Sequence, residues 1–139
     1  MQENKKIKVV IIEDDSYILD MYKIKFESSN FEVISAGDGM EGLKILEKKK
    51  PDIILLDIIM PKMDGFSVLK TIKNNPAIAK IPVVLLTNLG QREDIEKGFK
   101  LGATSYIIKA HFTPSEIVRK IRDILKKEND KSETEDNES

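Results

Sequence analysis

PDIILLDIIMPKMDGF, residues 51–66, is the stretch of sequence that decides the fold. Its apolar run at residues 53–56 ends at Asp57, and similar short runs of Ile, Val and Leu occur at residues 9–12 and 83–86. Strands of a parallel sheet are covered on both faces, so they read as continuous apolar runs rather than as alternating patterns. The three runs therefore predict buried parallel strands.

The other segments alternate between strand and helix signals. Weaker strands are predicted at residues 32–36 and 104–109, and the stretches between the strands show helical spacing. The start of the last helix is the clearest, because Thr113 as N-cap, Pro114 and Glu116 form a capping box. Five β-α repeats joined by right-handed crossovers predict an α/β domain, a doubly wound five-stranded parallel sheet with five helices.

Length and composition favour a single water-soluble domain. The 139 residues are 40% hydrophobic and 34% charged, with a net charge of -1 that argues against direct nucleic-acid binding. There is no cysteine, so we expect no disulfide and no thiolate metal site. The first residues lack the apolar core of a signal peptide, and no run reaches the ~18 apolar residues of a membrane span. We therefore expect a cytoplasmic protein without membrane insertion.

Three segments are expected along the chain. Residues 1–6 are predicted to be an N-terminal extension, and residues 7–126 are predicted to form the domain. From residue 126 the chain reads KKENDKSETEDNES, with three lysines, six acidic residues and no apolar residue, a net charge of -3. We expect the last helix to end near Lys127 and residues 127–139 to be an acidic, disordered tail.

Polar side chains follow the predicted strands at the points where they end. In an open α/β sheet, ligands bind beyond the carboxyl ends of the strands, so these side chains are the candidates for a site. Counting the five predicted strands along the chain, the residues concerned are Glu13, Asp14 and Asp15 after the first strand, Asp57 after the third, Thr87 after the fourth and Lys109 after the fifth.

This set of residue types suits phosphoryl transfer to an aspartate. Clustered carboxylates repel one another, and Mg²⁺ prefers such oxygen ligands while it retains several waters. An aspartate can act as a nucleophile toward phosphorus. We therefore expect Asp57 to attack, Glu13 and Asp14 to hold Mg²⁺, Lys109 to supply positive charge, and the Thr87 hydroxyl to donate a hydrogen bond.

Each residue also has a simpler interpretation. Asp14 or Asp15 can cap the first helix, and capping is the expected role of Asp15. Asp57 and Thr87, each taken alone, can be turn residues at a strand end. His111 has no second His or Cys at ligand spacing and is predicted to be a loop residue.

Five motifs in order resemble those of response regulator receiver domains, the family that includes the chemotaxis switch protein. They include VVIIEDDS, PDIILLDIIMPKMDGF, VVLLTN and GATSYIIK, and the resemblance spans residues 6–126. It implies the flavodoxin-like strand order 2-1-3-4-5. It also implies these roles: phosphoacceptor Asp57, acidic pair Glu13 and Asp14, a metal-binding backbone carbonyl at Ile59, and switch residues Thr87, Tyr106 and Lys109.

The resemblance implies a stand-alone signalling switch of a two-component system. Asp57 would accept a phosphoryl group from a sensor histidine kinase or a phosphotransfer protein, and the signal would leave by protein contact with a downstream target. Such a protein assists its own phosphorylation and dephosphorylation but is not an enzyme. It would be a monomer or a phosphorylation-dependent dimer, and either a terminal effector or a phosphorelay intermediate.

Two positions depart from the family pattern. The family lysine is usually followed by a cis proline, whereas Ala110 follows Lys109 here. Because a cis bond before a non-proline residue costs roughly 2.5–4 kcal/mol, either the fold supports that strain or the loop follows another path. Asn88 follows Thr87 where a small residue is common, and its size is expected to slow access to the site.

The predicted first helix carries two apolar stripes. One contains Ile18, Tyr22 and Phe26, and the other contains Tyr17, Met21 and Ile24. Either the second stripe faces solvent and is available to a partner, or both stripes are buried in the core.

Three other functions compete with the switch. The first is a non-phosphorylated pseudo-receiver adaptor, which the intact set of polar strand ends argues against. An aspartyl phosphatase of the haloacid dehalogenase type needs a second aspartate where Ile59 stands. A flavodoxin-like electron carrier needs a phosphate-binding loop where this chain has three consecutive acidic residues, starting at Glu13.

Overall fold

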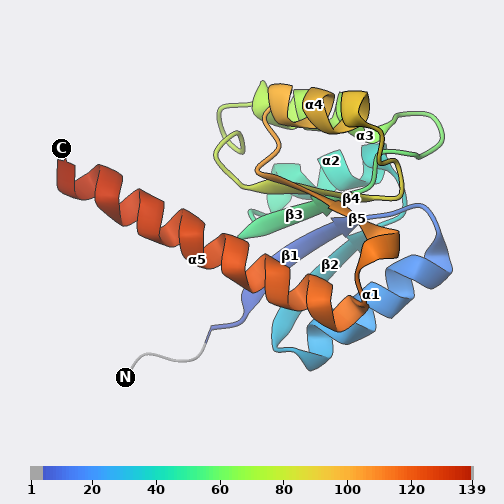
Figure 1. Cartoon of the computed structure of the whole chain (residues 1–139), viewed down its shortest axis with the longest axis horizontal. Coiled ribbons are helices and arrows are strands. Elements are labelled where there is room, and N and C mark those ends of the chain that lie inside the picture. Colours follow the sequence, from blue (N-terminus) through green and yellow to red (C-terminus); the bar gives the residue numbers. More distant parts are fainter. Residues whose placement is uncertain (1–4, 139) are drawn as a thin grey trace.

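The sheet is parallel and has five strands in the spatial order β2-β1-β3-β4-β5 (Figure 1). In this computed structural model, residues 5–138 are described, with side chains described as far as residue 131. The strands are β1 (Ile7–Ile12), β2 (Phe31–Ala36), β3 (Ile53–Leu56), β4 (Val83–Thr87) and β5 (Ser105–Ile108). The predicted α/β class and strand order are confirmed, and each predicted strand is found within two residues of its expected bounds.

Helices cover both faces of the sheet. They are α1 (Ser16–Ser28), α2 (Gly39–Lys48), α3 (Gly65–Lys73), α4 (Arg92–Lys100) and α5 (Pro114–Glu138). The first and last, α1 and α5, lie against one face, while α2, α3 and α4 lie on the other (Figure 1). Residues 5–138 contain no helix that is both long and apolar enough to span a membrane.

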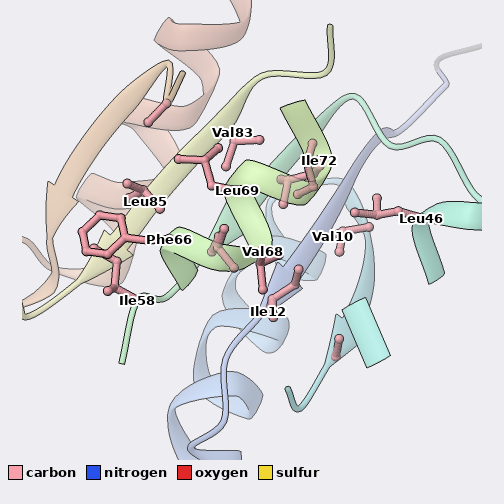
Figure 2. Close-up of a cluster of buried hydrophobic side chains, with 14 of the residues drawn as sticks. Val10, Ile12, Leu46, Ile58, Phe66, Val68, Leu69, Ile72, Val83 and Leu85 are labelled. Carbon is pink, nitrogen blue, oxygen red and sulfur yellow. The ribbon is translucent and has the colours of Figure 1, made fainter. Parts of the chain in front are cut away.

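Each face of the sheet packs into its own hydrophobic core. On one face, Val10 and Leu85 of the sheet pack with Leu69 and Ile72 of α3 (Figure 2). On the other face, side chains of the alternate strand positions pack against α1 and α5, including Phe26 and Ile121. Because neighbouring positions of one strand serve opposite cores, the two central strands β3 and β4 contain no polar residue until their carboxyl ends.

Aspartates and a threonine set the starts of four helices. Asp15, Asp38 and Asp64 each accept hydrogen bonds from backbone N–H groups in the first turn of α1, α2 and α3. At α5, Glu116 N donates to Thr113 Oγ1 (3.2 Å) and Thr113 N donates to Glu116 Oε1 (2.8 Å). The predicted capping box and the capping role of Asp15 are therefore confirmed.

The last helix is longer than predicted. It extends to Glu138, so its expected end near Lys127 is wrong, and residues 127–138 are helical rather than a disordered extension. No glycine or proline follows Pro114, so nothing in the sequence terminates the helix, and its polar end projects beyond the sheet (Figure 1). Of the predicted N-terminal extension, residues 1–4 lie outside the described residues, as does residue 139.

Candidate functional site

Buried polarity is concentrated at the carboxyl edge of the sheet. Among the described residues, the buried polar side chains are those of Glu13, Asp57 and Thr87, which are 3%, 7% and 0% exposed. They follow or end β1, β3 and β4, which are adjacent in the sheet. The predicted gathering of strand-end residues is therefore found, and it lies at the point where the chain direction across the sheet reverses.

Lys109 ties two of these side chains together. Its Nζ donates to Asp57 Oδ2 at 2.8 Å and also to Glu13 Oε1, and its side chain is only 9% exposed. Burial lowers the pKa of Lys109, but the hydrogen bonds to Asp57 and Glu13 and the negative charges of these two acids together outweigh burial and raise that pKa above its usual value. The lysine is therefore a fixed positive charge between two carboxylates.

The ionised form of the second acid, Glu13, is disfavoured in this site. Burial raises the pKa of Glu13, opposed by its hydrogen bonds from Lys109 and from the Asp15 N–H, and the nearby charge of Asp57 raises it further. A bound cation would relieve this repulsion, because it would favour the charged carboxylates that burial disfavours.

Backbone donors orient both buried carboxylates. Asp57 Oδ1 accepts from Ile58 N at 2.7 Å and from Ile59 N at 3.4 Å. Glu13 Oε2 accepts from Asp15 N at 3.0 Å. Each carboxylate is therefore held on one oxygen by the backbone and on the other by Lys109, which fixes its direction toward the site.

Three carboxylates are close enough to bind one cation. Oxygens of Glu13, Asp14 and Asp57 lie within 4.8 Å of one another, and Asp14 is exposed while the other two are buried. This all-oxygen donor set, open to water on the Asp14 side, fits Mg²⁺, which keeps several waters when it binds protein carboxylates. Asp15 is engaged as the cap of α1.

The two predicted switch residues share a backbone neighbour. Thr87 Oγ1 accepts from Leu89 N at 3.3 Å, and the Tyr106 hydroxyl donates to Leu89 O. Burial, followed by the negative charges of Asp94 and Asp57, raises the pKa of Tyr106 to about 12. Tyr106 is thus linked to the loop after β4 rather than directly to the carboxylates.

The segment after Lys109 takes its own path. Within residues 5–138 no peptide bond is cis, and Lys109–His111 forms a 3-10 turn. The N–H of Ala110 donates to Asn88 Oδ1 at 2.9 Å. The loop was expected either to hold a strained cis bond before Ala110 or to follow another path, and the structure has the other path. His111 lies in this turn, as its loop prediction requires.

Gly65 supports the site in a way that the sequence interpretation missed. Its N–H donates to Ile58 O at 2.8 Å, and a Cβ at this position would lie 2.1 Å from Asp57 O. Only a residue without a side chain permits this approach. The Asp-Gly dipeptide at 64–65 is the signal that points to a close turn there.

For Ile59, the structure describes the side chain and the backbone N–H. The side chain is 60% exposed, and its N–H faces Asp57 Oδ1. The resemblance implies a metal-binding role for the backbone carbonyl of Ile59, and that role stays a prediction. The haloacid dehalogenase alternative requires a carboxylate two positions after Asp57, and Ile59 stands there instead.

Comparison with known families gives one match along nearly the whole domain. Residues 9–122 match the family described as the response regulator receiver domain. Among curated proteins, the chain is 37% identical over 120 residues to the DNA-binding dual master transcriptional regulator RpaA of Synechocystis sp.. It is 34% identical over 120 residues to the alkaline phosphatase synthesis transcriptional regulatory protein PhoP of Bacillus subtilis. Each match covers 86% of this chain and 49% of the relative, so the chain spans about half the length of these relatives.

Solved structures agree with this match. Chemotaxis response regulator CheY4 of Vibrio cholerae is 28% identical with a TM-score of 0.80, and the match covers 86% of this chain and 98% of that one. A CheY-like receiver domain protein from Methanospirillum hungatei is 26% identical with a TM-score of 0.83, and the match covers 91% and 98%.

Proposed function

The chain belongs to the response regulator receiver domain family, and we propose that it is a phosphorylation switch whose phosphoacceptor is Asp57. One observation carries the proposal: a lysine with little exposure joins the Asp57 carboxylate to a second buried acid, beside a third carboxylate that is open to solvent. A structural ion pair would need only one acid. Two acids and a half-open third one form a site for a cation and an anionic group.

Glu13, Asp14 and Asp57 would hold Mg²⁺ in this proposal, with the backbone carbonyl of Ile59 as a further ligand. The ion would supply positive charge to oxygens of the transferring phosphoryl group. Its binding would compete with Lys109 for the Glu13 carboxylate. Lys109 would then be free to turn toward the phosphoryl group while it stays near Asp57.

The chemical step is a transfer from a phosphohistidine. A carboxylate oxygen of Asp57 forms the new bond to phosphorus, and the bond from phosphorus to the imidazole nitrogen breaks with its electrons leaving on the imidazole. The backbone donors on Oδ1 keep the carboxylate aimed at the site. Lys109 and the Thr87 hydroxyl would each bind an oxygen of the product, an aspartyl phosphate on this chain.

The loop after β4 would carry the change away from the site. When Thr87 turns toward the phosphoryl group, its hydrogen bond with Leu89 N is lost, and Leu89 O holds Tyr106. We propose that Tyr106 changes position with this loop. The size of the response depends on how much better the phosphoryl group is bound in the second arrangement than in the first.

A docking surface for the phosphodonor is available on α1. The structure decides between the two alternatives for this helix: Tyr22 and Phe26 are buried, whereas Tyr17, Met21 and Ile24 are 87%, 43% and 67% exposed. Receiver domains of response regulators partner with histidine kinases. We propose that this exposed apolar stripe contacts a sensor histidine kinase or a phosphotransfer protein.

The remaining features of the proposal follow from this role. The chain would be the recipient of the phosphoryl group and would assist the step without being an enzyme, and it would act in the cytoplasm. The curated relatives named above include a DNA-binding regulator, and half of its length lies outside the match. We propose that this domain passes its signal on by protein contact, without direct nucleic-acid binding.

Intact-mass measurement after incubation with acetyl phosphate tests the proposal. The wild type with Mg²⁺ is expected to gain the mass of one phosphoryl group, and Asp57→Asn and an EDTA-treated sample are expected to gain none. Asp52→Asn is the matched control, because Asp52 lies at the other end of the same strand and is exposed. A pseudo-receiver would show no adduct on the wild type, and an adduct that survives Asp57→Asn would place the acceptor elsewhere.

A further inference from the structure

We propose that Asn88 is a positioning residue that holds Lys109 in the site through its hydrogen bond with the next residue, Ala110. The bond joins Ala110 N to Asn88 Oδ1 at 2.9 Å, across 22 positions of sequence. The inference rests on the proposed function, since it concerns how the phosphoacceptor site is assembled. It replaces the earlier expectation that Asn88 acts through its size alone.

The bond lies where the sheet stops supporting the lysine. Pairing of β4 with β5 ends at Thr87 and Ile108, and Lys109 is the next residue along. The 3-10 turn that follows has an internal hydrogen bond, from Phe112 N to Lys109 O at 3.3 Å, which does not attach the turn to the sheet. The side chain of Asn88, one residue beyond the end of β4, provides that attachment to Ala110, two residues beyond the end of β5.

Fixing this turn matters because of how Lys109 reaches the site. Its flexible four-carbon stem must bring Nζ to Asp57 and Glu13, the carboxylates that follow two other strands. A displaced backbone would leave only some stem conformations able to reach both acids. Positioning errors of about 1 Å in a catalytic group reduce rates substantially.

Asn88 also joins the two groups that would bind the phosphoryl oxygens. It follows Thr87 directly, and it holds the residue after Lys109. Thr87 and the lysine segment are therefore linked through one side chain. A shift of the loop after β4 would be passed to the lysine segment through this bond.

The donor and the acceptor form a matched pair. Proline at position 110 would have no N–H, and the Asn88 carbonyl would then have no donor there. Alanine at 110 supplies the N–H, and asparagine at 88 supplies an acceptor of the right reach. The two substitutions that remove the bond, one from each side, should therefore not have independent effects.

A double-mutant cycle tests this coupling. The rate of Asp57 phosphorylation by acetyl phosphate at saturating Mg²⁺ is measured for Asn88→Leu, which keeps the size but removes the acceptor, for Ala110→Pro, and for the double variant. Asn88→Leu is expected to slow the reaction about two- to twelvefold, the range that corresponds to the loss of one hydrogen bond. In the Ala110→Pro background the same change should have no further effect. Asn88→Asp, which keeps an acceptor oxygen, should restore most of the rate.

A second readout separates this inference from the proposed function. The ¹³C chemical shift of the Asp57 carboxyl carbon, recorded without metal or phosphodonor, reports whether Lys109 is in place. Asn88→Leu is expected to move the shift toward the value of Lys109→Met, and Asn88→Asp is not. An unmoved shift, or rate losses that multiply in the double variant, would overturn the role of Asn88. Absence of any adduct on the wild type would instead reject the phosphoacceptor, while the shift would still decide the role of Asn88.

Discussion

The two ends of the same sheet differ in whether their charged side chains are buried or exposed. At the carboxyl ends of the strands, Glu13 and Asp57 are buried, and both are bonded to Lys109, whose side chain is only 9% exposed. At the amino ends, a wide groove is lined by charged residues that remain exposed, among them the lysines Lys5, Lys6, Lys8, Lys50, Lys80 and Lys131. Both ends are charged, but only one of them removes its charges from water.

This difference determines where a substitution has a large effect. Exposed charges are screened by water and salt, so single pairs contribute little. Buried charges interact strongly, and removing one partner leaves the other uncompensated. The burial is also what raises the pKa of Glu13 and makes the carboxyl edge suited to a cation. The chemistry is therefore expected at the carboxyl edge, although the amino edge carries more lysines.

The largest expected effect comes from replacing a lysine at the carboxyl edge, and replacing a lysine at the amino edge is its control. Lys109→Met should slow phosphorylation of Asp57 by acetyl phosphate about 100-fold, because a preorganised donor to the phosphoryl oxygens is lost. Lys50→Met removes an exposed lysine at the amino edge and should change the rate by less than about twofold. Equal losses in the two variants would show that general positive charge, and not the buried site, supports the reaction.

The next effect concerns the backbone beneath the acceptor. Gly65→Ala places a Cβ 2.1 Å from Asp57 O and should lower the free energy of unfolding by about 2 kcal/mol or more. At Gly37 the nearest atom to such a Cβ is a flexible side-chain oxygen 3.9 Å away, so Gly37→Ala should change stability by less than about 1 kcal/mol. Urea unfolding of both variants makes the comparison, and a tolerated Gly65→Ala would contradict the close approach.

Metal addition should stabilise the carboxyl edge by a smaller amount. Mg²⁺ at ten times its dissociation constant raises the free energy of unfolding by about 1.4 kcal/mol if it binds the folded state alone. Thermal unfolding of the wild type should therefore shift upward with Mg²⁺ and return with EDTA. Asp14→Asn should weaken the shift, and Asp52→Asn at the amino edge should keep it. A shift that is the same in both variants would rule out the three-carboxylate site.

The smallest effect is spectroscopic and concerns Tyr106. Its raised pKa means that the folded protein keeps this phenol protonated where an unfolded tyrosine ionises. The raised pKa of Tyr106 therefore stabilises the fold at pH values below 10.0, the ordinary pKa of tyrosine, and this contribution is lost as the pH rises through about 12. The ultraviolet absorbance titration of the wild type minus that of Tyr106→Phe should have its midpoint near pH 12. A midpoint near pH 10 would show that the phenol is not desolvated.

Most of the fold could be predicted because the central strands are buried on both faces. That burial requires continuous apolar runs, and runs such as residues 53–56 have few other interpretations. The end of α5 could not be predicted from burial, because Leu125 is the last buried residue among the side chains described, which reach residue 131, while the helix continues to Glu138. Its continuation depends on the lack of a terminating residue, which is a weaker signal.

The site was predictable in its members but not in its contacts. The ends of the strands indicated Asp57 and Lys109, since parallel strands bring their carboxyl ends to one edge. The bridge from Lys109 to Glu13 joins residues 96 positions apart, and the bond from Ala110 to Asn88 depends on a turn with no sequence signature. These contacts are tertiary, so a single sequence does not specify them.

The most direct test of the central claim locates the phosphoryl group within one peptide. The tryptic peptide from Lys50 to Lys62 contains both Asp52 and Asp57, one aspartate from each edge of the sheet. After incubation with acetyl phosphate and Mg²⁺, borohydride reduction converts an aspartyl phosphate to homoserine, which fragment masses locate. Homoserine at position 57, with Asp52 intact and no conversion in EDTA, is the predicted result. Conversion at position 52, or conversion that does not require the metal, would contradict the assignment of function to the buried edge.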